Sequence, residues 1–289
     1  MRTAEFDYEL PEELIAQHPV PQRDQSRLLV LERRTGKIEH CAFNQLPAFL
    51  SSNDLLVLND SRVIPARLRA LNAQTGGRFE ILLLEEIDVN NWWVMMRPGK
   101  RARVGTKIRL EDCAGTSSKV EATVVETDPE GQRRLEFQGT KNIKEMLELL
   151  GEVPLPPYIA REGHEHMAED RERYQTVFAR QPGSVAAPTA GLHFTLPLLQ
   201  ELRSRGVAIC YVTLHVGSGT FAPVKSESIA AHKMHEETYR LGQETASLIN
   251  QTRQRKGRIV AVGTTALRVL ETAAAQVRAG RAESTSDRE

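Results

Sequence analysis

A continuous apolar run at residues 55–58 constrains the fold of this chain more than any other stretch, because it ends directly in the polar loop Asn59-Asp60-Ser61-Arg62. An apolar run without alternation predicts a strand that is buried on both faces, as in the sheets of α/β proteins. Residues 207–214 and 258–262 show the same pattern. Because α/β sheets bind their ligands at the carboxyl ends of their strands, we expect a functional site at the loop that begins with Asn59.

Residues 63–150 have a different pattern, in which apolar and polar residues alternate over short segments such as 66–71 and 119–125. Glycine and proline separate these segments, for example at Gly76-Gly77 and Pro98-Gly99. Short alternating strands divided by turns predict a small antiparallel β-barrel. The predicted fold class is therefore α/β: a discontinuous α/β domain, residues 1–62 and 151–289, with a barrel domain of residues 63–150 inserted into it.

Several helices are expected around the strands. Pro11 predicts the start of a short helix within residues 8–15, and an amphipathic helix at 143–150 is expected to end at Gly151. Thr195 is a suitable N-cap for a helix that ends at Gly206, and residues 266–277 predict one more. Residues 162–173 are nearly all charged or small, which predicts a mobile loop.

The composition excludes several classes of protein. Lysine plus arginine equals aspartate plus glutamate at 38 each, which argues against a uniformly basic surface for nucleic acid but allows a local basic patch. No apolar run is long enough to span a membrane and no signal peptide is recognisable, so a cytoplasmic protein is expected. The three cysteines lack the spacing of zinc ribbons or iron-sulfur clusters, and we expect them to be reduced and buried.

Such a local basic patch is present in the predicted barrel. Residues 62–110 hold ten lysines or arginines against four acidic residues, and six of these cations lie between residues 97 and 109 with no acid among them. They could neutralise several phosphates, and Trp92-Trp93 could offer a face for base stacking. The alternative is a solvated barrel loop with tryptophans in the core. The residues alone leave both interpretations open.

Two loops of small residues contain histidine. Residues 184–195 combine His193 with alanine, glycine and threonine, which allows a ligand to approach the backbone closely, although a tight turn with a satisfied histidine is the simpler alternative. The second loop begins with His215 after the strand at 207–214, so we expect the two loops to face one cleft. Its Gly217-Ser218-Gly219 does not complete a dinucleotide-binding fingerprint, because position 222 is Ala222.

The stretch His232-Lys233-Met234-His235-Glu236 places two imidazoles and a carboxylate within one helical turn. This spacing can bind a metal, but the HExxH pattern of metalloproteases fails because position 239 is Tyr239. Positioning of a substrate, acid-base chemistry and a purely structural role all remain open for these residues. A resident metal is not expected.

Taken together, these motifs closely resemble the family of S-adenosylmethionine:tRNA ribosyltransferase-isomerases of queuosine biosynthesis, over essentially the whole chain. The resemblance is carried in one order by Leu58-Asn59-Asp60-Ser61-Arg62-Val63-Ile64-Pro65-Ala66-Arg67, Arg97-Pro98-Gly99-Lys100, Pro154-Leu155-Pro156-Pro157-Tyr158-Ile159, Tyr174-Gln175-Thr176-Val177, residues 186–195, Leu214-His215-Val216-Gly217, Gly219-Thr220-Phe221, residues 232–236 and Val262-Gly263-Thr264-Thr265. It implies an α/β domain with an inserted barrel. It also implies a reaction in which S-adenosylmethionine donates its ribosyl group to the aminomethyl group of a 7-deazaguanine base at the tRNA wobble position, giving epoxyqueuosine-tRNA, adenine and methionine.

The resemblance suggests roles for particular residues. An attacking amine must be neutral and a departing adenine needs a proton, which are tasks for histidines and carboxylates. The candidate catalytic residues are Asp60, His193, His215 and Glu236. The candidates for binding S-adenosylmethionine and the base are Thr189, Ala190, Gly191, Gly217, Gly219, Thr220, Phe221, Gly263, Thr264 and Thr265. The candidates for binding tRNA are Arg62, Arg97, Lys100, Arg101 and Arg103. S-adenosylmethionine is implied as a co-substrate, no metal or redox cofactor is expected, and the chain is expected to act as a monomer.

The chain departs from the family pattern in two places. Family members continue past the helix at 266–277 with another strand and a further segment of the same domain, so we expect the α/β domain to be incomplete at its C-terminus. Phe178 stands where the family usually has tyrosine. A shortened, non-catalytic protein that binds tRNA and S-adenosylmethionine is one alternative. A methyltransferase is another, but residues 58–61 lack the glycine-rich loop that usually follows the first strand of such enzymes.

Overall fold

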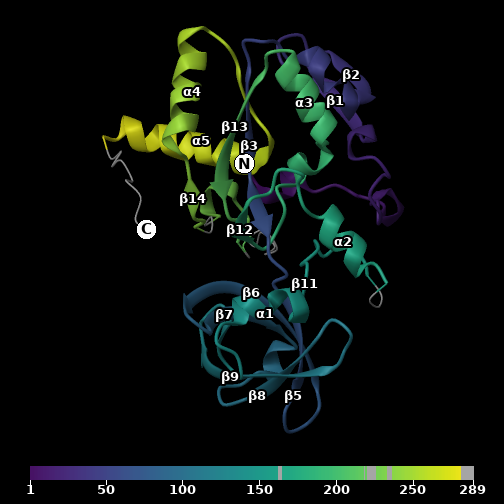
Figure 1. Ribbon diagram of the computed structural model, residues 1–289, viewed down its shortest axis with the longest axis vertical. Helices are drawn as coiled ribbons and strands as arrows, with labels where there is room; N and C mark the ends of the chain where they lie inside the picture. The colour runs from purple at the N-terminus through teal and green to yellow at the C-terminus, as the bar shows by residue number, and fades with distance from the viewer. Residues whose placement is uncertain (162–164, 218, 220–225, 233–235, 281–289) are drawn as a thin grey trace.

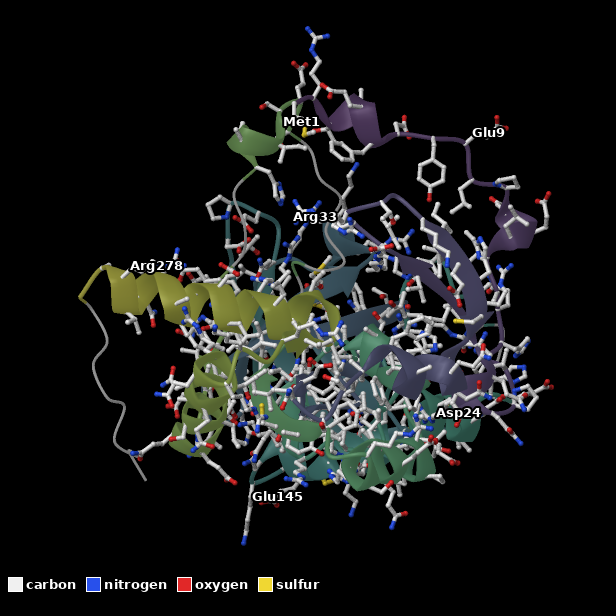
Figure 2. All side chains as sticks on the ribbon, turned by 90° about the horizontal axis from the view of Figure 1, so that it is seen from above. Met1, Glu9, Asp24, Arg33, Glu145 and Arg278 are labelled. Carbon is white, nitrogen blue, oxygen red and sulfur yellow. The ribbon has the colours of Figure 1, made fainter. Side chains whose placement is uncertain are left out.

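The computed structural model describes residues 1–161, 165–217, 219, 226–232 and 236–280. An α/β part forms one end of the molecule and a β-barrel forms the other, and β11 and the segment after β3 lie between them (Figure 1). Figure 2 shows the N-terminal segment running along the outside of the α/β part from Met1 past Glu9 to Asp24. None of the described helices is long and apolar enough to cross a bilayer.

A four-stranded sheet is the centre of the α/β part. Its order is β14 (Tyr239–Arg240), β13 (Ala208–Leu214), β3 (Leu55–Asn59) and β15 (Ile259–Ala261). β13 and β15 pair with β3 in parallel on its two sides, and β14 adds to β13 antiparallel. Every residue of β3 is buried. The strands predicted from continuous apolar runs are therefore confirmed.

Helices cover both faces of this sheet. α3 (Leu196–Ser204) packs with η4 (Phe43–Phe49) on the face that includes Leu56 and Leu58. α4 (Gln243–Gln254) and α5 (Gly263–Arg278) pack on the face that includes Leu55 and Val57. The hydroxyl oxygen of Thr195 accepts a hydrogen bond from the Leu198 amide at 3.2 Å, which confirms the predicted N-cap of α3.

The amino end of the sheet is held by a buried carboxylate. Asp54, only 1% exposed, accepts a hydrogen bond from the Ser51 amide at 2.7 Å and from Nε of Arg258 at 2.9 Å. Arg258 also donates to the carbonyl oxygen of Phe49 at 2.7 Å. The hydrogen bonds from Arg258 hold the pKa of Asp54 well below its usual range. This ion pair ties the first residues of β3 and β15 to the chain that precedes the sheet.

The barrel is closed. β5 (Arg67–Asn72), β6 (Arg78–Asp88), β7 (Asn91–Arg97), β10 (Arg133–Gln138), β9 (Ser117–Thr127) and β8 (Lys107–Glu111) pair antiparallel in that order, and β8 pairs back with β5. α1 (Ile143–Leu150) packs its buried face against the barrel core, and β11 (Gly151–Glu152) pairs with the first residues of β5. Trp92 is 4% exposed in that core, so the interpretation of Trp92 as a stacking surface is wrong, because the alternation of β7 turns its ring inward.

The remaining elements are short. η1 (Thr3–Phe6), η2 (Glu12–Leu14) and η3 (Arg23–Gln25) precede the hairpin of β1 (Arg27–Leu31) and β2 (Ile38–Ala42). η5 (Gly99–Arg101) follows β7, and η8 (Ile229–Ala231) lies before β14. β12 (Gln181–Ser184) pairs in parallel with β4 (Ser61–Val63).

Two local predictions need correction. The helix expected within residues 8–15 is limited to the single turn η2, because exposed side chains dominate this segment. The loop expected at 162–173 contains the helix α2 (Met167–Arg173), while residues 162–164 lie outside the described part. All three cysteines are free, but Cys210 alone among them is buried, and Cys41 and Cys113 are half-buried.

Candidate functional site

The carboxyl edge of the parallel strands is organised by Asn59. Its side-chain amide donates to the carbonyl oxygen of Leu214 at 3.0 Å, and its side-chain oxygen accepts from the amides of Leu214 and Ser61 at 3.0 and 3.1 Å. Asn59 is 1% exposed, so its hydrogen bonds are made in a water-poor environment. They fix the end of β3 against the end of β13 and set the direction in which Ser61 points.

Ser61 and His215 form the central pair of this edge. The hydroxyl group of Ser61 and Nδ1 of His215 are 2.8 Å apart. Gly183 of β12 lies against the imidazole: a Cβ atom at this position would be 3.1 Å from both Cε1 and Nδ1. The φ angle of Gly183 is +144°, a conformation that strongly favours glycine. The ring is therefore held between a hydroxyl group and a backbone that has no side chain.

The environment of His215 favours a neutral imidazole. Burial lowers the pKa of His215, and the negative charge of Asp60 opposes this shift only in part. Asp60 does not bond to the ring; its carboxylate accepts the hydroxyl hydrogen of Thr213 at 2.7 Å. Since Nδ1 is engaged with Ser61, the tautomer of His215 is set by the direction of the Ser61 hydroxyl, and Nε2 is the nitrogen that can exchange a proton with a ligand.

The two histidine-containing loops lie next to each other, through Ser184. The Ser184 hydroxyl donates to the carbonyl oxygen of Ala186 at 2.7 Å and accepts from the amide of Val216 at 2.9 Å. The Val185 amide also donates to the carbonyl oxygen of Val216 at 3.0 Å. Ser184 is completely buried. The start of the loop at 184–195 and the start of the loop at 215–217 are thus joined into one wall.

The small residues in η6 (Thr189–His193) serve packing as well as access. A Cβ on Gly191 would be 2.9 Å from the side chains of both Phe178 and Thr176. On Gly263, at the start of α5, a Cβ would be 3.2 Å from that of Ala190, and its φ angle is +81°. The loop at 184–195 and the N-terminus of α5 are therefore in close contact. Thr189 and Thr264 are exposed beside this contact, and the hydroxyl of Thr265 is buried with no hydrogen-bond partner among the described residues.

His193 lies in a different environment. Its ring packs against Phe43 with centroids 5.3 Å apart, and it makes a hydrogen bond to the backbone of Arg23. Burial lowers the pKa of His193. No hydrogen bond or ring contact joins it to Ser61 or His215 in the described part of the chain. This environment corresponds to the satisfied histidine of a tight turn, the alternative left open by the sequence.

At the other side of His215, Glu237 approaches the site and Glu236 does not. Glu237, 5% exposed at its side chain, accepts from the amide of Gly217 at 3.0 Å and forms an ion pair with Arg268 of α5. Glu236 is exposed. The expected helical turn at 232–236 is not testable, because residues 233–235 lie outside the described part. Thr220 and Phe221 also lie outside it, and Gly219 is half-buried.

The cations predicted to bind tRNA fall into two places. Arg62 lines a cavity of about 380 Å³ between the α/β part and the barrel, together with Arg23 and Arg171. Arg97, Lys100, Arg101 and Arg103 are all exposed on the barrel. Arg133 holds their loop by donating to the carbonyl oxygens of Ala102 and Gly99 at 2.6 and 2.9 Å. The cavity contains none of the four candidate catalytic residues.

Sequence reasoning singled out neither Gly183 nor Glu237, and it named Ser184 only as the first residue of the loop at 184–195. The motif of residues 58–67 does contain Ser61, but a strand pattern cannot say which residue faces a distant histidine. Glu236 was chosen instead of its neighbour Glu237, because no helix or strand pattern in this stretch indicates which side chains face the site. A different cluster, His18, His166 and Glu169, has potential metal ligands close together, whereas sequence spacing had suggested residues 232–236.

Comparison with known proteins gives consistent matches. Residues 3–287 match a family model described as queuosine biosynthesis protein. An S-adenosylmethionine:tRNA ribosyltransferase-isomerase of Acetivibrio thermocellus is 50% identical over 94% of this chain and 77% of its own length. One of Desulforamulus reducens is 47% identical over the same shares. A crystal structure of S-adenosylmethionine tRNA ribosyltransferase from Thermotoga maritima is 37% identical, with 93% of this chain and 73% of that chain covered and a TM-score of 0.43.

Proposed function

Because the chain belongs to the queuosine biosynthesis protein family, we propose that it is an S-adenosylmethionine:tRNA ribosyltransferase-isomerase. In this reaction the ribosyl group of S-adenosylmethionine is transferred to the 7-aminomethyl-7-deazaguanine base at the tRNA wobble position and isomerised. Adenine and methionine are released, and epoxyqueuosine-tRNA is formed. The observation that carries the proposal is the agreement of the family match, over nearly the whole chain, with a neutral histidine at the carboxyl edge of the sheet.

His215 is the proposed acid-base group. A neutral imidazole with Nδ1 engaged by Ser61 can take a proton from the attacking amine at Nε2, or give one to the departing adenine. Asp60 lies beside it and stabilises the imidazolium that forms when a proton is taken. Glu236 and His193 remain further candidates. We rank Glu237 above Glu236, because Glu237 already bonds to Gly217.

The edge formed by the loops at 184–195 and 215–217 and by the start of α5 is the proposed site for S-adenosylmethionine. α5 begins at Gly263, and the free amides of a helix N-terminus attract carboxylates such as that of the methionyl group. The exposed Thr189 and Thr264 are suitable hydrogen-bond partners for the ribose or the base. Ala190, Gly191, Gly217, Gly219 and Thr265 line the same edge in this proposal, with Thr220 and Phe221 as further candidates.

The proposed tRNA contacts are the exposed cations. Arg62, with Arg23 and Arg171, brings positive charge to the cavity between the two parts of the molecule. Arg97, Lys100, Arg101 and Arg103 add a second basic area on the barrel. β5 leaves the α/β part at Arg67 and ends at Asn72, a length of roughly 17–20 Å, so an RNA that contacts both areas lies along the barrel.

The proposal includes no resident cofactor for the reaction. S-adenosylmethionine is a co-substrate, the enzyme acts as a monomer, and it works in the cytoplasm, where its tRNA substrate is present. The alternatives are a non-catalytic protein that binds tRNA and S-adenosylmethionine, and a methyltransferase. With the same substrates, the first predicts binding without any product and the second predicts S-adenosylhomocysteine.

The test is incubation of the full chain with S-adenosylmethionine and tRNA that carries the precursor base, followed by chromatography of the small molecules. Equal amounts of free adenine and methionine are expected. S-adenosylhomocysteine would instead demonstrate methyl transfer. Binding of both substrates without any product would support the non-catalytic alternative and refute the enzymatic proposal for this chain.

The basic area has its own test. Replacing Lys100, Arg101 and Arg103 by alanine is expected to weaken tRNA binding and reduce its dependence on salt concentration, because fewer counterions are released. A matched control removes three exposed cations of the β1–β2 hairpin, Arg33, Arg34 and Lys37. An equal change of the salt slope in both variants would show that net charge alone is responsible.

A further inference from the structure

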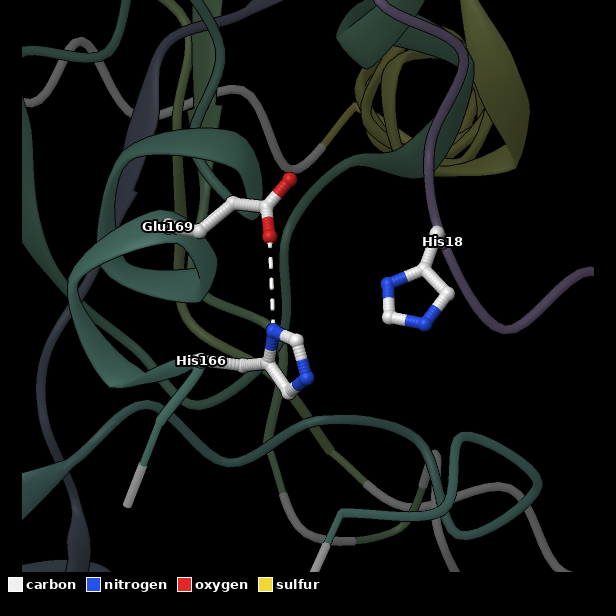
Figure 3. Close-up of side chains that lie close together, drawn as sticks. All are labelled: His18, His166 and Glu169. Atoms are coloured by element: carbon white, nitrogen blue, oxygen red, sulfur yellow. Dashed lines mark ion pairs between the residues drawn. The ribbon is translucent and has the colours of Figure 1, made fainter.

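A cluster of two imidazoles and a carboxylate lies outside the proposed ribosyl-transfer site (Figure 3). Each of His18, His166 and Glu169 offers one potential ligand atom, and these three atoms lie within 4.8 Å of one another. Nδ1 of His166 is 3.6 Å from the Glu169 carboxylate, and the rings of His18 and His166 meet edge to face with centroids 5.1 Å apart. His18 and Glu169 are exposed and His166 is half-buried, so solvent ions have direct access.

Two separate segments supply these ligands. His166 is the N-cap of α2 and Glu169 lies in its first turn, three residues later, so both side chains project from one face of the helix. His18 comes from the N-terminal segment that follows η2. Figure 3 shows the His18 ring on a different strand of backbone, facing the side chains that come from α2.

The backbone on either side of His18 is already fixed to the same region. The side-chain amide of Gln17 donates to the carbonyl oxygen of Tyr158 at 3.0 Å, and the backbone carbonyl oxygen of Gln17 accepts from Arg161 at 2.9 Å. Arg161 in turn makes two hydrogen bonds of 2.8 Å to Asp170 of α2.

On the other side of His18, Arg173 of α2 donates to the carbonyl oxygens of Pro21 and Val20 at 2.9 and 2.6 Å. His18 is thus presented to α2 before any ion binds, which lowers the entropy cost of bringing the ligands together.

We propose that His18, His166 and Glu169 bind a divalent transition-metal ion of the zinc class. Two imidazole nitrogens and one carboxylate oxygen are a ligand set that suits Zn²⁺, with water in the fourth position. Ligand atoms around tetrahedral zinc are about 3.4 Å apart, so the ligand atoms need to approach one another by up to about 1.4 Å, which rotation of the side chains allows. Asp170 is not a ligand, because Arg161 engages both of its oxygens.

The bound ion acts as a clamp between the N-terminal segment and α2, and it takes no part in ribosyl transfer. α2 carries Arg171 and Glu172, which line the cavity between the two parts of the molecule, and Arg23 of the same N-terminal region lines it as well. Arg23 also donates to the backbone carbonyl oxygen of Glu172 at 2.9 Å. Joining the two segments at His18 therefore restricts the wall of this cavity.

The experiment measures Zn²⁺ binding to the chelator-treated full chain by isothermal titration calorimetry, and the melting temperature with and without Zn²⁺. We expect one ion per chain and a higher melting temperature when it is bound. His18→Ala and Glu169→Gln are each expected to weaken binding by more than about tenfold. His40→Ala, an exposed histidine on β2, is the matched control and is expected to leave both measurements unchanged.

A second arm addresses the other histidine-rich stretch with His232→Ala. Loss of binding in His232→Ala, with full binding in His18→Ala, would overturn the proposal and assign the ion to residues 232–236. The absence of Zn²⁺ binding by the unaltered chain would overturn it too. Glu169→Gln, at an exposed position, keeps the test valid should His18→Ala fail to fold. Because no ribosyl transfer is measured, the outcome is independent of the proposed enzymatic function.

Discussion

Replacing Gly183 by alanine tests whether the backbone of β12 holds the His215 imidazole in place. The added methyl group would lie 3.1 Å from Nδ1 and Cε1 of that ring, closer than nine in ten Cβ contacts in proteins. The ring cannot retreat freely, because its Nδ1 is hydrogen-bonded to Ser61 at 2.8 Å. The substitution therefore forces a choice between a shifted imidazole and a shifted strand.

The expected loss in the free energy of unfolding has two contributions. A non-glycine residue at a φ angle of +144° costs about 1–3 kcal/mol in backbone strain. Weakening the hydrogen bond between Ser61 and His215 costs about 1 kcal/mol more. We expect a loss of roughly 2–4 kcal/mol in the free energy of unfolding. A displacement of His215, the proposed acid-base group, by a few tenths of an ångström to 1 Å is expected to lower kcat by roughly 10- to 100-fold.

The assay combines urea unfolding with the rate of adenine release at saturating substrates. Gly131→Ala is the control, because Gly131 also has a positive φ angle, +90°, but its Cβ would meet nothing within 4 Å. Its expected cost is about 1–2 kcal/mol, with unchanged kcat. If Gly183→Ala matches Gly131→Ala in both stability and kcat, the close contact with His215 has no functional consequence and the reasoning fails.

Three further predictions concern the ion pair, the histidines and a packed glycine. Asp54→Asn is expected to lower the free energy of unfolding at pH 7 by about 2–3 kcal/mol, a value kept modest because the Arg258 side chain is 62% exposed. Since the folded-state pKa of Asp54 is depressed, its contribution is complete above the unfolded pKa of about 3.9 and is lost as the pH falls through the folded pKa, so the difference between the two proteins narrows below about pH 4 in urea titrations. His215→Ala is expected to lower kcat by more than about 100-fold with little change in tRNA affinity, and His193→Ala to lower it less, as measured by adenine release and a binding titration. Gly191→Ala is expected to destabilise the fold by about 1–3 kcal/mol in urea unfolding, because its methyl group would overlap Phe178.

Each of these has a result that would contradict it. A stability difference for Asp54→Asn that stays constant down to pH 3 would mean that the carboxylate does not titrate as expected. A larger loss of kcat in His193→Ala than in His215→Ala would return His193 to the centre of the site. An unchanged midpoint of urea unfolding for Gly191→Ala would show that Phe178 moves aside without cost.

The main strands could be predicted from the sequence because a strand that is buried on both faces consists of a continuous run of apolar residues. β3, β13 and β15 are apolar without interruption or nearly so, and the barrel strands alternate because one side of each faces a core. The meeting of residues at the carboxyl edge also followed from the sequence, since parallel strands bring their ends together. Ser61 and His215 lie at that edge, although they are 154 positions apart.

Individual side-chain environments could not be predicted in the same way. His193 was expected in the cleft, but its ring packs against Phe43, a contact that depends on how η4 crosses the sheet. α2 was expected to be a loop because of its charged composition, although methionine, alanine, glutamate and arginine are good helix formers. The approach of His18 to α2 depends on hydrogen bonds from Arg161 and from Arg173 of α2 to the irregular N-terminal segment, and such contacts give no periodic pattern in the sequence.

The neighbouring ends of the barrel explain how a domain of this size can interrupt another. Glu152 of β11 pairs with Arg67 of β5, so the chain departs from the barrel beside the point at which it arrived. Gly151 fills this junction so tightly that a Cβ would be 1.9 Å from the carbonyl oxygen of Pro65. Because the two ends of the inserted segment lie side by side, the barrel connects two neighbouring points of the α/β part, as a short surface loop would. Inserting it therefore adds little loop-closure entropy cost to the folding of that part. The two parts can therefore change independently in evolution: the exposed surface of the barrel can change while the sheet that carries His215 keeps its geometry.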